Sequence, residues 1–76
     1  MTQAERQKRW GANLVKIREA QGIPNRYALA RRAGVDPSYL RRIENGTVNA
    51  GDETRVKLAE VLGVTVEAIW SYAEGE

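Results

Sequence analysis

Glycines divide this sequence into short stretches in which apolar residues repeat every three or four positions. The glycines that follow or interrupt such a stretch are Gly22, Gly34, Gly46, Gly51, Gly63 and Gly75. Glycine is common just after the last turn of a helix, because it adopts positive φ without a Cβ penalty. The apolar spacing is typical of amphipathic helices, and few β-branched runs that would favour strands occur. The sequence therefore predicts an all-α fold of five short helices.

Most of the predicted helices follow a residue that commonly caps the beginning of a helix. The helices span about residues 3–21, 26–33, 37–44, 52–62 and 66–72. Residues that can cap the first backbone N–H groups precede four of them, namely Thr2, Asn25, Asp36 and Thr65. We expect one domain, residues 1–76, with its core within about residues 10–70 and short polar ends. A chain this short buries roughly 60% of its surface, and without cysteine it has no disulfide to reinforce the core.

The composition excludes several classes of chemistry. Histidine and cysteine are both absent, which removes the commonest metal ligand, the usual general base near neutral pH and any thiolate site. Asp52 and Glu53 are adjacent, but they point in different directions on a helix, and their place at its beginning suits the helix dipole. The sequence shows no phosphate-binding loop and no nucleophile–base pair. We therefore expect neither an enzyme nor a metal or cofactor site.

Charge and hydropathy indicate which class of partner and which cellular compartment to expect. Residues 1–42 carry ten Lys and Arg against three Asp and Glu, whereas residues 43–76 carry two against seven. This asymmetry favours a polyanionic partner for the basic half, the alternative being that its arginines only form solvated helix faces. No apolar run is long enough to span a membrane, and the N-terminus lacks the apolar stretch of a secretory signal. We expect a cytoplasmic protein that binds no membrane.

The segment from residue 25 to residue 46 carries the most specific pattern. A predicted helix of about nine residues and a second one of similar length are joined by Gly34, Val35 and Asp36. Helices joined by so tight a turn cross closely, so the first must present small side chains, here Ala30 and Ala33. Gly34 allows the backbone to turn, and Val35 fills the corner. This is the pattern of a helix-turn-helix, whose second helix can lie in a DNA major groove.

The chain resembles the Cro and lambda-repressor group of helix-turn-helix domains, also called the XRE family. Four motifs carry the resemblance, in order: Leu14-x-x-Ile17-Arg18-x-x-x-Gly22, Leu29-Ala30-x-x-Ala33-Gly34-Val35, Leu40-x-x-Ile43-Glu44-Asn45-Gly46 and Leu58-Ala59-x-x-Leu62-Gly63-Val64. They cover about residues 10–70. The resemblance implies a compact five-helix, lambda-repressor-like fold whose second and third helices form the helix-turn-helix.

The resemblance also implies which residues would contact DNA. Residues on or beside the outer face of the third helix would approach the bases: Pro37, Ser38, Tyr39, Arg41 and Arg42. Arg42 is the leading candidate, since arginine bonds bidentately to guanine. For Tyr39 the alternative is packing against its neighbours. Residues that open the second helix or follow the third would contact phosphates: Asn25, Arg26, Asn45, Thr47 and Asn49.

Two further pairs receive roles from the same resemblance. Arg18 and Glu44 match a partly buried ion pair between the first and third helices, the alternative being two unrelated exposed charges. Trp70 and Tyr72 fall in a region through which members of the family commonly dimerise, the alternative being that both rings cover the domain's own core.

Together these features predict a sequence-specific regulator of transcription that binds double-stranded DNA. It would be a small repressor of phage, plasmid or bacterial origin, acting as a homodimer that reads an inverted repeat. The alternative is a protein-interaction module of the same fold, antitoxin-like or an adaptor, with little DNA binding. The loop after Gly46, which has no Lys or Arg, and the acidic C-terminal half motivate that alternative.

Overall fold

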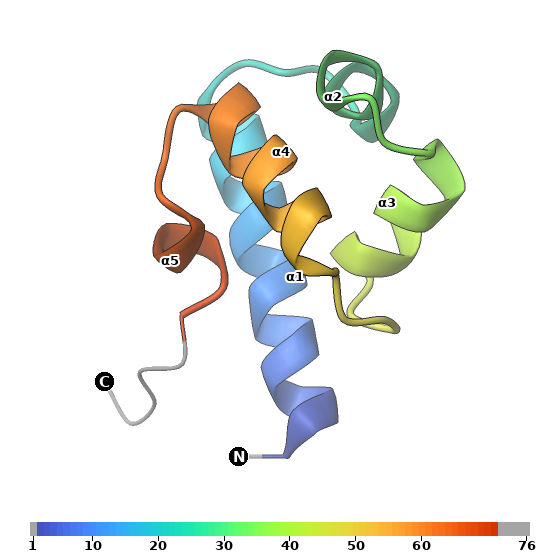
Figure 1. The fold of residues 1–76 in the computed structure, drawn as a ribbon, viewed down its shortest axis with the longest axis vertical. Coiled ribbons are helices and arrows are strands. Elements are labelled where there is room, and N and C mark those ends of the chain that lie inside the picture. The colour runs from blue at the N-terminus through green and yellow to red at the C-terminus, as the bar shows by residue number, and fades with distance from the viewer. Residues whose placement is uncertain (1, 72–76) are drawn as a thin grey trace.

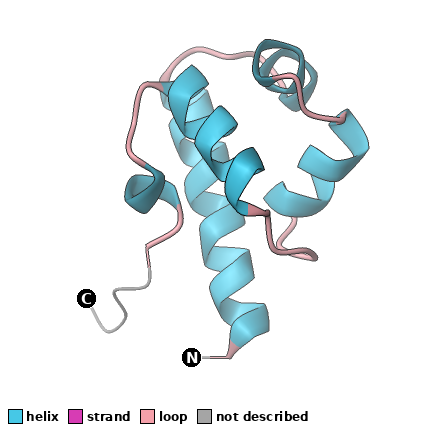
Figure 2. Ribbon diagram, viewed as in Figure 1, coloured by secondary structure: helices cyan, strands magenta, loops and turns pink. Residues whose placement is uncertain are grey.

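The computed structural model describes residues 2–71, and within that range the chain forms five helices and no strand (Figures 1 and 2). The helices are α1 (Gln3–Ala20), α2 (Arg26–Ala33), α3 (Pro37–Glu44), α4 (Asp52–Leu62) and α5 (Val66–Ile69). The prediction of an all-α fold with five short helices is confirmed. The observed bounds agree with the predicted ones to within a residue, except at the end of α5.

Side-chain caps fix where the helices begin. The Thr2 hydroxyl accepts a hydrogen bond from the Glu5 N–H at 3.1 Å, and Glu5 accepts one from the Thr2 N–H at 2.8 Å. The bond from the Thr2 N–H holds the pKa of the exposed Glu5 carboxyl below its usual value. Asn25, Asp36 and Thr65 each accept a bond from the backbone N–H three residues further on. All four predicted caps are confirmed.

The longest helix, α1, organises the others. α3 and α5 both pack against it, α2 packs against α3 and α4, and α4 packs against α5. In Figure 1, α2 and α3 lie on one side of α1 and α5 lies on the other. The helix-turn-helix therefore stands to one side of a scaffold made by α1, α4 and α5.

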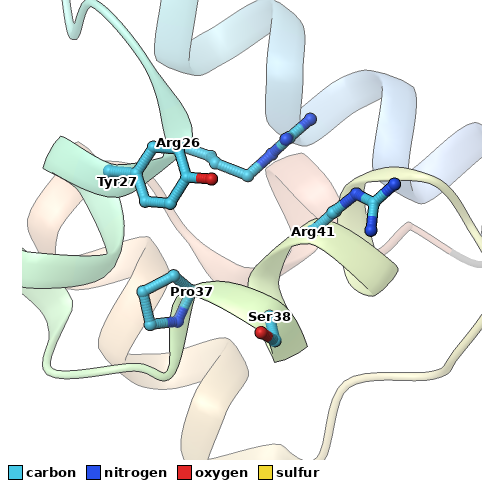
Figure 3. A pocket seen from close by; sticks show the side chains of 5 residues that line it. All are labelled: Arg26, Tyr27, Pro37, Ser38 and Arg41. Carbon is cyan, nitrogen blue, oxygen red and sulfur yellow. The ribbon is translucent and has the colours of Figure 1, made fainter.

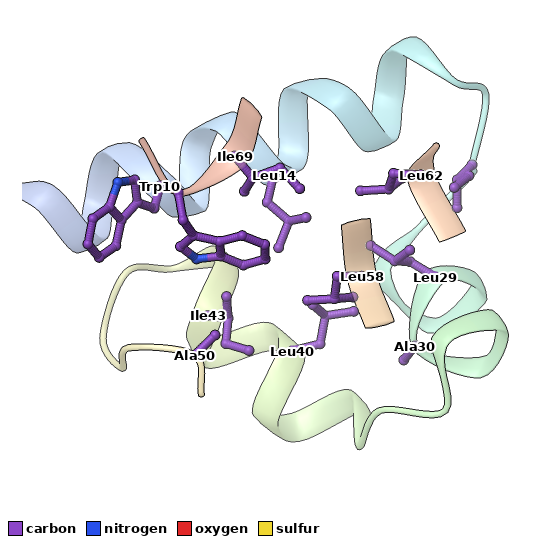
Figure 4. Close-up of a cluster of buried hydrophobic side chains, with 12 residues drawn as sticks. Trp10, Leu14, Leu29, Ala30, Leu40, Ile43, Ala50, Leu58, Leu62 and Ile69 are labelled. Atoms are coloured by element: carbon purple, nitrogen blue, oxygen red, sulfur yellow. The ribbon is translucent and has the colours of Figure 1, made fainter. Parts of the chain in front are cut away.

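A single cluster of buried apolar side chains joins all five helices (Figure 4). Its fully buried members include Leu14 of α1, Leu29 of α2, Leu40 of α3, Leu58 of α4 and Ile69 of α5. Each such side chain stabilises the fold by about 1.5–3 kcal/mol relative to an exposed position. Because every helix contributes to one cluster, α3 cannot shift without disturbing the whole core.

The C-terminal helix ends earlier than the sequence indicates. α5 is a single turn that stops at Ile69, and Trp70 has a non-helical backbone with φ −103° and ψ 57°. Asn13 donates to the Ile69 carbonyl at 3.1 Å, and the Trp10 indole donates to the Ser71 carbonyl at 2.8 Å. These bonds hold the chain that follows α5 against α1.

Candidate nucleic-acid interface

The turn between α2 and α3 fixes the angle at which α3 leaves the core. Gly34 ends α2 in the left-handed conformation, with φ 69° and ψ 36°, as the sequence predicts. The Val35 N–H then donates to the Ala30 carbonyl at 2.9 Å, and the Val35 side chain packs against the core. Asp36 caps the first turn of α3 directly afterwards. The turn is thus closed by backbone bonds, a half-buried side chain and a cap.

α3 has one buried face and one exposed face. Leu40, Ile43 and Glu44 are buried, whereas four of the predicted base-reading residues are exposed: Pro37, Ser38, Arg41 and Arg42. Neither Arg41 nor Arg42 is covered by the rest of the described chain. The helix therefore presents two guanidinium groups and a hydroxyl to a ligand outside the protein.

Tyr39 takes a different place from the other predicted base-reading residues. Its side chain is half-buried and packs against the core. Its hydroxyl accepts a hydrogen bond from the Gly51 N–H at 3.2 Å. The ring thus ties the loop between α3 and α4 to α3, which agrees with the packing alternative left open by the sequence.

Glu44 lies at the centre of a buried ionic cluster. One of its carboxylate oxygens accepts from Arg18 Nε at 3.0 Å, and the other accepts from Arg26 Nε at 3.1 Å. The side chains of Glu44 and Arg18 are only 1% and 9% exposed. The expected pairing of Arg18 with Glu44 is present. For the second partner, Arg26, the sequence predicts only a phosphate contact, and nothing in the spacing of these residues reveals its bond to Glu44.

Arg26 therefore links α2 to α3 while part of it stays accessible. Its side chain is 32% exposed, and only its Nε is bonded to Glu44 in the cluster. A guanidinium has five N–H donors, so bonding through Nε leaves the terminal nitrogens with donors to offer. Arg26 can hold the helix-turn-helix together and still face a phosphate.

The other predicted phosphate contacts fall into two groups. Asn45 and Thr47 are exposed where α3 ends, and the Thr47 hydroxyl donates to the Arg42 carbonyl at 3.2 Å. Asn25 and Asn49 are exposed as well, but the side-chain oxygen of each already accepts a bond within the protein. Because a phosphate accepts hydrogen bonds, these two asparagines would bind it through the side-chain NH₂ group.

Close contact with α1 sets the position of the C-terminal end of α3. A Cβ atom added at Gly11 would lie against the Glu44 carbonyl oxygen and 2.6 Å from the Ile43 carbonyl oxygen. At Gly46, which has φ +76°, a Cβ would lie 2.6 Å from the Lys8 Cα. The absence of side chains at these two glycines lets α1 and the end of α3 meet backbone to backbone.

A hollow of about 200 Å³ separates the first turns of α2 and α3 on the exposed side (Figure 3). The residues that line it are Arg26, Tyr27, Pro37, Ser38 and Arg41. Tyr27 is 59% exposed, although it is a large aromatic residue. Tyr27 is not among the site residues predicted from the sequence. The helical phase set by the buried Leu29 and Ala30 would have placed it on the outer face of α2.

The predicted dimer contact at Trp70 is wrong. Trp70 is only 2% exposed and belongs to the core cluster of its own chain. The Arg55 guanidinium lies over both the Trp70 ring, at 5.5 Å, and the Trp10 ring, at 5.1 Å. Trp70 is therefore covered from within the domain and leaves almost no surface for a partner. Tyr72, the other residue of that prediction, lies outside the described residues.

Residues 2–71 contain no group of three or more acidic side chains arranged to hold a metal ion. No helix in this part of the chain is both long and apolar enough to cross a bilayer. On α3, the exposed Ser38, Arg41 and Arg42 offer hydrogen bonding and attraction of anions.

Comparison with known proteins agrees with this geometry. The sequence pattern of a family described as helix-turn-helix matches residues 14–69. The match includes all of α2, the turn and α3, together with the core residues of α4 and α5. No curated protein matches the chain.

Proposed function

Because the chain belongs to the lambda-repressor-like helix-turn-helix family of DNA-binding domains, we propose that it is a sequence-specific regulator of transcription. α3 would enter the major groove, which admits an α-helix and displays a distinct pattern of polar groups for each base pair. The observation that carries this proposal is the division of α3 into two faces. Its inner face is fixed by the core and by Glu44, and its outer face presents Arg41 and Arg42.

The proposed contacts follow from exposure and reach. Ser38, Arg41 and Arg42 would bond to base edges, and Pro37 would lie against them. Asn25, Arg26, Asn45, Thr47 and Asn49 would contact phosphates on either side of α3. Such contacts fix the register of the helix on the duplex, and they carry no sequence information directly. Tyr39 enters this proposal as the residue that holds the loop after α3 in place, since its hydroxyl is bonded to Gly51.

We further propose that the protein represses transcription by occupying its site as a homodimer. Two copies would place two α3 helices about one turn of DNA apart and would read an inverted repeat. Trp70 plays no part in this contact, because it is buried in its own chain. The distance between the two half-sites in bound DNA shows how the two copies of the protein pair.

Replacing Arg42 with alanine is expected to relax sequence preference. The bidentate bond of an arginine to guanine provides about 1–3 kcal/mol of discrimination, and that part should be lost at one base pair of each half-site. The measurement is the affinity for a panel of duplexes that vary one base pair at a time. Arg32→Ala is the matched control, since Arg32 is exposed on α2. It should weaken binding to every duplex by a similar small factor. An unchanged preference profile in Arg42→Ala would remove Arg42 from the base-reading set.

The second candidate function is a protein-interaction module of the same fold. The exposed Asp52 and Glu53 at the beginning of α4 favour it, because they follow a loop that carries no Lys or Arg and would repel a nearby phosphate. A titration with genomic and random duplexes at several salt concentrations separates the two. A DNA-binding regulator should lose affinity steeply as salt rises, because phosphate contacts release counterions. Absence of binding to any duplex at low salt would favour the interaction module.

A further inference from the structure

The hollow between α2 and α3 has an apolar side, of which the contacts proposed above use Pro37 but not Tyr27. Figure 3 shows the Tyr27 and Pro37 rings on one side of the hollow and Arg41 on the other. The two rings come from different helices, and both residues are exposed. They form a small apolar surface on a face where the other lining residues are Arg26, Ser38 and Arg41.

The surroundings of the two rings restrict what can bind there. The neighbouring guanidinium groups favour an anionic partner. A polyanion that displays an apolar group would therefore suit both the cationic side and the apolar side of the hollow. In the DNA major groove the apolar group on display is the C5 methyl group of thymine. The hollow opens on the same exposed side as Ser38 and Arg41, which the proposed function places at the bases.

We infer that Tyr27, together with Pro37, contacts a thymine methyl group and adds a specificity determinant on α2 to those on α3. This inference rests on the proposed function, since it concerns a base in the same DNA site. Tyr27 then reads a base pair through shape and apolar contact, while Arg41 and Arg42 read their bases by hydrogen bonds. Tyr27 is exposed in the free protein because its partner is the DNA.

The test replaces each thymine of the preferred duplex, one at a time, with uracil. Uracil keeps the base pair and removes only the methyl group. At one position in each half-site the protein should bind the uracil duplex about fourfold more weakly, the effect of returning one methyl group to water. In Tyr27→Ala the preference for the thymine duplex at that position should fall well below fourfold, since only Pro37 is left to contact the methyl group. The combination of the two changes isolates the contact between the ring and the methyl group.

Two variants control this experiment. Tyr27→Phe keeps the ring and should keep the fourfold preference, whereas a hydroxyl bond to phosphate would be lost and would weaken all duplexes alike. Val56→Ala removes another exposed apolar side chain, 46% exposed on α4, and should leave the preference unchanged. Thermal melting followed by circular dichroism verifies that each variant is folded, and the exposure of Tyr27 makes unfolding by its replacement unexpected.

The possible outcomes distinguish this inference from the proposed function. If the protein prefers a sequence but no thymine-to-uracil change matters, or the effect persists in full in Tyr27→Ala, the methyl contact is overturned and the regulator stands. A preferred site that contains no thymine would also overturn the methyl contact and leave the proposed regulator standing. If the protein prefers no duplex over random sequence, the proposed function itself fails.

Discussion

Replacing Glu44 with glutamine is expected to lower the free energy of unfolding by about 3–5 kcal/mol, since removing one partner of a buried ion pair strands the other charge. The neutral amide would leave Arg18, 9% exposed, without its carboxylate, and would also release Arg26. A domain of this size has a total stability on the order of 4–11 kcal/mol. The substitution should therefore remove a large part of the stability of the domain. Urea denaturation followed by circular dichroism measures the change.

Glu53→Gln is the matched control for this substitution. It also removes a carboxylate from an ion pair, with Lys57 at 3.8 Å, but Glu53 is 86% exposed. Surface pairs of this kind contribute about 0–1 kcal/mol, so this variant should remain close to the parent protein. Equal losses in the two variants would show that burial of Glu44 has no particular weight, and the anchoring of α3 through this cluster would be wrong.

Replacing Gly11 with alanine is expected to destabilise the protein, although alanine is the better helix former. Helix propensity alone predicts a gain of about 1 kcal/mol within α1. The added Cβ, however, would meet the carbonyl oxygens of Ile43 and Glu44, and backbone atoms cannot move aside as a flexible side chain can. Overpacking of this kind costs about 1–3 kcal/mol, so the net change should be a loss. The shift in the midpoint of urea denaturation gives its sign.

Lys16→Ala serves as the control on the same helix, because Lys16 is exposed and its replacement should change stability by less than about 0.5 kcal/mol. A Gly11→Ala variant more stable than the parent would mean that α1 and α3 do not meet as closely as described. A confirmed loss would explain why the middle of α1 contains a poor helix-forming residue.

Local features of the fold could be predicted from the sequence because their causes lie within a few residues. Thr2, Asn25, Asp36 and Thr65 cap the helices that follow them, and each cap depends on a backbone N–H three residues away. Gly34 ends α2 for an equally local reason, its positive φ. The exposure of the outer face of α3 follows from helical phase once Leu40 and Ile43 are assigned to the core.

Long-range contacts could not be predicted in this way. Arg26 reaches Glu44 across 18 positions, and from one sequence an arginine that opens a helix looks the same whether it binds phosphate or a carboxylate. The burial of Trp70 depends on α1 and Arg55, which approach it only in three dimensions. The early end of α5 also involves distant residues, since Trp70 leaves the helical conformation and packs into the core formed with the other helices.

We propose above all that the outer face of α3 enters the major groove and reads bases. Selection of bound duplexes from a random library by the purified protein tests it most directly, because it requires no assumption about the site. We expect an enriched motif that contains guanine, with a preference that Arg42→Ala weakens at defined positions. Recovery of no motif, at salt concentrations low enough for any duplex to bind, would contradict it.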